Sequence, residues 1–68
     1  MYEKEKDAIR DAMPLSCKVR SNGKVYDGVI TWKKRKFPLV IFDRHGKAEL
    51  SWDLAKRCMI GECKEIIY

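Results

Sequence analysis

The spacing of hydrophobic residues changes along this chain, and its first part follows a helical period. Ile9, Ala12 and Met13 recur at the spacing of one helix face. Acidic residues begin the segment, as the helix dipole favours, and Pro14 excludes the preceding residue from helical geometry. The pattern predicts a helix over residues 2–13. Because so short a helix is marginal alone, its apolar face must contact the rest of the fold or a partner.

After this helix the period changes to two. Residues 15–20 alternate apolar and polar side chains, which predicts a half-buried strand. Asn22 and Gly23 follow, a strong hairpin signal because both residues tolerate positive φ. The returning segment, residues 25–32, has apolar residues on both faces, which indicates a strand covered on both sides. Gly28 interrupts this strand and predicts a bulge at which it bends.

The second half of the chain repeats these signals in shorter form. Residues 39–43 are a nearly continuous apolar run, typical of a central strand covered on both faces. Residues 48–52 alternate again. A helical turn is expected near 52–60, with Ser51 or Asp53 as its N-cap.

The order of these elements predicts a mainly β fold. Residues 63–68 are apolar enough to add a short closing strand, so we expect a small barrel of four or five antiparallel strands. A chain of 68 residues has room for one domain, 1–68, in which a helix over 2–13 precedes a barrel over 15–68. Since a core of this size supplies little stability, a homodimer is a further expectation.

Composition and cysteine usage narrow the class of protein. Apolar residues make up 46% of the chain and charged residues 37%, which favours a folded domain. We expect no signal peptide and no membrane span, and hence a soluble protein of the cytoplasm, nucleus or nucleoid. Cys17, Cys58 and Cys63 are too few for a disulfide scaffold and are expected to be reduced thiols. With His45 they lack the spacing of a zinc site, so we expect neither a metal nor a cofactor.

Positive charge is concentrated in the middle of the chain. The net charge is +5, but within residues 18–47 nine cations stand against only Asp27 and Asp43. Four of them, Lys33–Lys36, form an uninterrupted run between Trp32 and a phenylalanine. Such a field attracts polyanions, and an adjacent aromatic ring is a candidate for base stacking. The candidate nucleic-acid-binding residues are Lys18, Arg20, Lys24, Trp32, Lys33, Lys34, Arg35, Lys36, Arg44 and Lys47.

Three segments, "CKVRSNGKVYDGVI", "PLVIFDRHGKAEL" and "SWDL", resemble the Tudor family over residues of about 15–55. The resemblance implies a Src-homology-3-like barrel and an aromatic cage that binds methylated lysine or arginine. Tyr26 and Phe42 match cage positions, whereas His45 stands where the family has a tyrosine. Lys47 replaces the family's asparagine, and a lysine beside a cage for a cation disfavours that activity.

The sequence shows no catalytic constellation. It has no Ser-His-Asp or Cys-His pattern and no glycine-rich phosphate loop, so we expect a protein without enzymatic activity. The favoured function is nucleic-acid binding through phosphate contacts of the basic hairpin face. The alternative is a protein-interaction or inhibitor module, of the kind that a virus encodes, binding an acidic partner surface. In a third interpretation the basic run is only the solvated tip of a hairpin.

Overall fold

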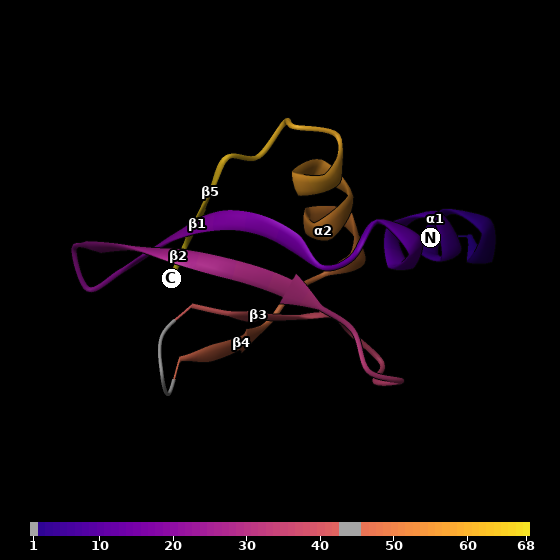
Figure 1. Cartoon of the computed structure of the whole chain (residues 1–68), viewed down its shortest axis with the longest axis horizontal. Coiled ribbons are helices and arrows are strands. Elements are labelled where there is room, and N and C mark those ends of the chain that lie inside the picture. The colour runs from indigo at the N-terminus through magenta and orange to yellow at the C-terminus, as the bar shows by residue number, and fades with distance from the viewer. Residues whose placement is uncertain (1, 43–45) are drawn as a thin grey trace.

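Two helices and five strands follow one another along the described residues of the chain (Figure 1). The structure, a computed structural model, describes residues 2–42 and 46–68. The elements are α1 (Glu3–Ala12), β1 (Leu15–Ser21), β2 (Lys24–Thr31), β3 (Leu39–Ile41), β4 (Lys47–Glu49), α2 (Trp52–Met59) and β5 (Glu65–Ile67). The predicted helix over 2–13 and helical turn near 52–60 are confirmed, as is the mainly β class. Within the described part of the chain, neither helix is long and apolar enough to cross a membrane.

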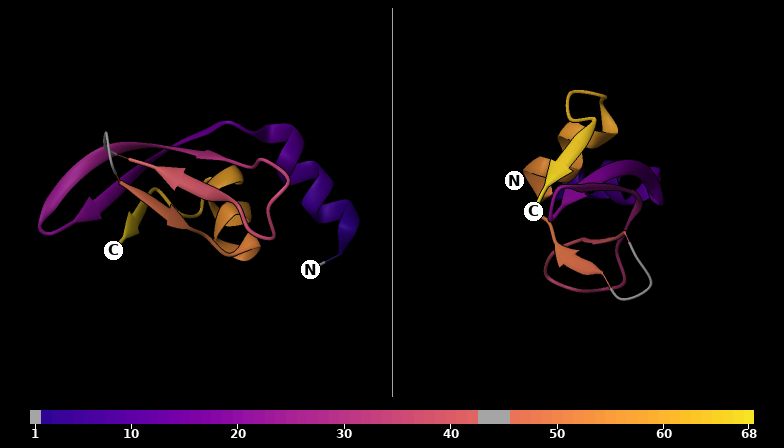
Figure 2. Two further views of the ribbon diagram at one scale, coloured as in Figure 1. Left: turned by 90° about the horizontal axis from the view of Figure 1, so that it is seen from below. Right: turned by 90° about the vertical axis from the view of Figure 1, so that its left-hand side faces the viewer.

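The five strands form one curled sheet in the order β4-β3-β2-β1-β5 (Figure 2). Strands β1 to β4 are an antiparallel meander, whereas β5 lies parallel to β1. Two predictions are therefore wrong: the sheet is mixed rather than antiparallel, and it is a half-barrel rather than a closed barrel. The mixed pairing follows from the path of the chain: β4 runs opposite to β1, and after α2 the chain returns as β5, which therefore runs in the direction of β1 beside it. The curl remains compatible with a Src-homology-3-like barrel.

The hairpin of β1 and β2 forms as its turn chemistry predicts. Asn22 and Gly23 have φ values of 52° and 77°, the left-handed geometry that matches the twist of a two-residue hairpin. Ser21 pairs with Lys24 directly beside the turn. The predicted hairpin is confirmed.

Gly28 is required by close packing instead of by a bulge. The register of β1 and β2 runs unbroken through the Cys17–Gly28 pair, so the predicted bulge is wrong. A Cβ at Gly28 would lie 2.9 Å from Val19 Cγ2 and 3.2 Å from Val40 Cγ2. The missing side chain lets the three strands β1, β2 and β3 approach closely on the inner face of the sheet.

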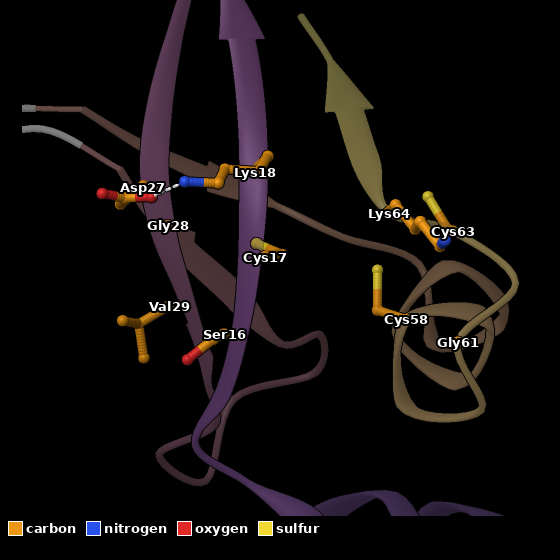
Figure 3. A pocket seen from close by; sticks show the side chains of 10 residues that line it. All are labelled: Ser16, Cys17, Lys18, Asp27, Gly28, Val29, Cys58, Gly61, Cys63 and Lys64. Atoms are coloured by element: carbon orange, nitrogen blue, oxygen red, sulfur yellow. Dashed lines mark hydrogen bonds and ion pairs between the residues drawn. The ribbon is translucent and has the colours of Figure 1, made fainter.

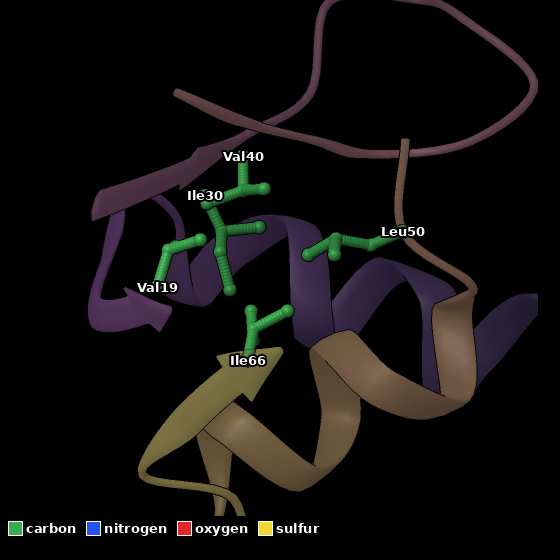
Figure 4. Packing of buried hydrophobic residues seen from close by; sticks show 5 residues of the cluster. All are labelled: Val19, Ile30, Val40, Leu50 and Ile66. Atoms are coloured by element: carbon green, nitrogen blue, oxygen red, sulfur yellow. The ribbon is translucent and has the colours of Figure 1, made fainter. Parts of the chain in front are cut away.

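One apolar core fills the inner face of the sheet. Its buried residues come from four strands and from the segment that leaves β4 (Figure 4). They are Val19, Ile30, Val40, Leu50 and Ile66. On the outer face, the described residues form no covering layer over Val25, Val29 and Ile41, which are 52%, 40% and 39% exposed. The prediction that β2 and β3 are covered on both faces is therefore wrong.

A second cluster joins the two helices. Ile9 of α1 is fully buried against Trp52 and Ala55 of α2. Ser51 caps α2, since its hydroxyl accepts a hydrogen bond from the backbone N–H of Leu54 at 3.1 Å. The apolar face of α1 thus docks on α2 within the chain, at the end of the sheet where β2 leaves for β3 (Figure 1).

Candidate nucleic-acid interface

Two tryptophans hold the basic loop that connects β2 to β3, residues 32–38. The indole N–H of Trp32 donates to the backbone carbonyl of Arg35 at 2.6 Å. The indole N–H of Trp52 donates to the carbonyl of Lys36 at 3.0 Å. Because both donors bind backbone, the four side chains of Lys33–Lys36 are left exposed to solvent. The loop therefore presents its charge from an anchored backbone.

Trp32 has a packing role in this arrangement. Its half-buried ring lies 6.2 Å from that of Trp52, centroid to centroid. The guanidinium of Arg10 lies over the same ring, 4.9 Å from its centroid. These contacts tie the loop to both helices. The predicted role of Trp32 in base stacking stays a prediction.

A small hollow of about 150 Å³ lies between the basic loop and the outer face of the sheet. It is lined by Thr31, Lys33, Arg35, Leu39, Ile41 and Lys47. Strand register explains this set, because Thr31 pairs with Leu39 and Ile41 pairs with Lys47. Outward-facing residues of three strands thus meet two cations of the loop. Three of the ten predicted binding residues come together here.

The three cations of the hollow have no carboxylate partner among the described residues. The ion pairs of the described chain involve none of Lys33, Arg35 and Lys47. Each side chain carries several hydrogen-bond donors and no acceptor, so together they suit an anion. Among the described residues, the hollow therefore gathers three cations that no described ion pair involves.

The other predicted cations are placed differently. Lys18 forms an ion pair with Asp27, and Arg20 forms one with Glu65 at 2.6 Å. Lys24 is the first residue of β2, and the basic loop follows the last residue of β2 (Figure 1). At ~3.3 Å per residue, the length of β2 places Lys24 about 25 Å from the loop. That exceeds the Debye length of about 8 Å in physiological salt. The structure therefore groups the loop with Lys47 and leaves the hairpin cations apart.

Two further predicted residues, Arg44 and His45, lie outside the described residues.

The candidate cage residues Tyr26 and Phe42 are in contact, with ring centroids 6.0 Å apart. Sequence reasoning missed a third ring, Tyr68, which stacks on Phe42 at 6.0 Å and 9°. The sequence does contain a signal for this contact: Tyr68 lies two residues after Ile66 and therefore on the same face of the closing strand. These three rings pack against one another, and the cage formed by Tyr26, Phe42 and His45 stays a prediction.

A separate cavity of about 500 Å³ lies beside β1 (Figure 3). All three cysteines line it together with residues of β1, β2 and the segment before β5. Burial raises the pKa of Cys17, and burial raises the pKa of Cys58 to about 12, with Cys63 adding to the effect. Protonated thiols are poor nucleophiles and poor metal ligands. Among residues 2–42 and 46–68, no group of three or more His, Cys, Asp or Glu is placed to hold a metal ion.

Comparison of the chain with protein-family models, with curated proteins and with solved structures finds no match. The resemblance to the Tudor family therefore rests on local sequence pattern and on the curl of the sheet. The geometry of the basic loop and its hollow carries the functional argument.

Proposed function

We propose that this protein binds nucleic acid without catalysing a reaction on it, and that it does so at the hollow beside the basic loop. The observation that carries the proposal is the meeting of Lys33, Arg35 and Lys47 around one hollow without a described carboxylate partner. Phosphodiester groups offer the acceptors that such donors need. Binding of this kind releases counterions and is sequence-tolerant.

The anchored backbone of the loop supports the proposal. Hydrogen bonds from Trp32 and Trp52 already hold the loop in the unbound chain. Ordering a flexible loop opposes association, so a loop that is held beforehand costs less to bind. The cations of Lys33–Lys36 then need only side-chain adjustment to reach phosphates.

The test is a fluorescence-anisotropy titration of short labelled DNA and RNA at several salt concentrations. For about three phosphate contacts we expect a log–log salt slope near −3 for duplexes and near −2 for single strands. A triple variant, Lys33→Gln, Arg35→Gln and Lys47→Gln, should lose at least about tenfold in affinity and most of that slope.

The matched control removes three cations elsewhere, by Lys4→Gln, Lys24→Gln and Lys64→Gln. Each variant loses three positive charges from a net charge of +5, so the two variants have the same net charge. We expect the control to keep most of the affinity. An equal loss in both variants would show that only net charge matters and would overturn the proposed site.

The second candidate function is binding of an acidic protein surface, and the exposed apolar residues of the sheet favour it. Val29 and Ile41 form a cross-strand pair on the outer face, next to the same cations. A protein interface rests on a few desolvated anchors, so its affinity should fall much less with salt. Failure of every nucleic acid to bind at low salt would leave two interpretations, an acidic protein partner and a solvated hairpin tip, and a pull-down against cellular protein would separate them.

A further inference from the structure

We propose that the hollow takes single-stranded nucleic acid in particular, with one base against its apolar floor and the neighbouring phosphates on its cationic rim. This inference rests on the proposed function and names its substrate class. Phosphate contacts alone do not distinguish single strands from duplexes. The discrimination comes from the floor of the hollow.

The floor is apolar and open to solvent. Leu39 and Ile41 project outward from β3, and the side chain of Ile41 is 39% exposed. A site for phosphates alone has no use for such a surface, because burying apolar groups against a charged phosphate gains nothing. The flat ring of a base gains from it.

The rim surrounds the floor from two sides. Lys33 and Arg35 come from the loop, and Lys47 comes from the edge strand β4. A strand that crosses the hollow thus meets positive charge before and after the floor, which is the alternation of phosphate and base in a single strand. The volume of about 150 Å³ is well below that of sites for drug-sized ligands, and it accommodates one ring system.

A duplex cannot use the floor. Its bases are stacked and paired inside, so it presents phosphate and sugar to an outward-curved sheet. Turning one base out of a duplex costs a few kcal/mol, whereas an unpaired strand avoids that cost. The duplex therefore retains only the electrostatic part of the binding energy.

The experiment compares three probes of equal length at one salt concentration: a single strand, a duplex, and a strand that carries abasic sites. The abasic strand keeps the phosphates and lacks the bases. We expect the single strand to bind about five- to tenfold more tightly than the abasic strand and than the duplex, because one base contact on an open floor lies at the lower end of the usual range, about 1 kcal/mol.

Two conservative variants test the floor within the protein. Ile41→Thr keeps a β-branched side chain, so the strand is preserved while the floor becomes polar. It should weaken the single strand several-fold and leave the duplex affinity and the salt slope unchanged. Val25→Thr makes the same kind of change on the same outer face but outside the hollow, and it should leave every probe unaffected.

The outcomes separate the two proposals. Equal binding of the three probes, with no effect of Ile41→Thr, would overturn the single-strand inference and leave phosphate binding intact. No binding of any nucleic acid in low salt would overturn both. Binding of a glutamate-rich peptide instead, weakened by Ile41→Thr, would also overturn both and assign the hollow to an acidic protein partner.

Discussion

The hydroxyl of Tyr68 donates a hydrogen bond to the backbone carbonyl of Glu49, with 3.1 Å between the two oxygens. This bond joins the two edges of the half-barrel. The backbone N–H of Tyr68 donates to the carbonyl of Arg20 in β1 at 2.8 Å, so the residue extends the pairing of β5. Its side chain reaches Glu49 of β4 through the hydrogen bond of its hydroxyl. A side chain thus spans the gap that backbone pairing would close in a complete barrel.

Loss of this hydroxyl should destabilise the fold by a modest amount. The ordinary pKa of a tyrosine, 10.0, already keeps the hydroxyl protonated at neutral pH, and burial raises the pKa of Tyr68 further, so the hydroxyl is a donor there. We expect Tyr68→Phe to lower the free energy of unfolding by about 0.5–1.5 kcal/mol in urea denaturation. Tyr2→Phe is the control, because Tyr2 is 82% exposed. Equal effects of the two changes would contradict a bridging role for Tyr68.

Docking of α1 depends on one buried side chain. Ile9 is fully buried between the helices, so Ile9→Ala should cost about 2–4 kcal/mol in the free energy of unfolding. That is a large share of the stability of a domain this small. Ile67→Ala removes the same atoms from a residue that is 75% exposed and should cost far less. Thermal denaturation followed by circular dichroism measures both, and similar midpoints would argue against the docked helix.

The curl of the sheet depends on the missing side chain of Gly28. A methyl group there would press on Val19 and Val40, so Gly28→Ala should destabilise the fold by about 1–3 kcal/mol. Val19→Ala removes the nearest contacting atom. In a double-mutant cycle, the two changes together should cost less than the sum of the single changes. Simple additivity, measured by urea denaturation, would show that Gly28 is needed for another reason.

Thiol protonation predicts a pH dependence of stability. The pKa of Cys58 is raised from 9.0 to about 12 in the folded chain, mainly by burial. The folded state therefore holds this proton more tightly, and the resulting stability is complete below pH 9 and is lost as pH rises toward about 12. Cys58→Ala should show a shallower fall in unfolding free energy over this range than the unchanged protein. Parallel curves would contradict the raised pKa.

The same thiol should react slowly. Alkylation requires the thiolate, so iodoacetamide should modify Cys58 at pH 8 far more slowly in the folded chain than in denaturant. Mass spectrometry of digested samples gives the rate for each cysteine. A rate near that of the denatured chain would place Cys58 in solvent instead of in the cavity wall.

Local chemistry in the sequence determined most of the elements. The helical period around Ile9, the turn at Asn22 and Gly23, and the cap at Ser51 each act within a few residues. These features form because of local backbone preferences and need no contact with distant residues. The sequence therefore predicts the position of each helix and of the hairpin. It also shows directly where positive charge is concentrated.

Long-range packing decided the rest. Whether β5 runs parallel or antiparallel to β1 depends on the path of the chain after α2, which no local pattern encodes. A continuous apolar run does not show whether a second layer covers it, so the sequence does not predict that Ile41 is exposed. The hollow follows from the register of β3 with β4, which brings Lys47 beside a loop distant in sequence. Sequence determined which residues carry charge, and only tertiary structure decided which of those charges meet, because their meeting depends on strand order and curvature that the whole core sets.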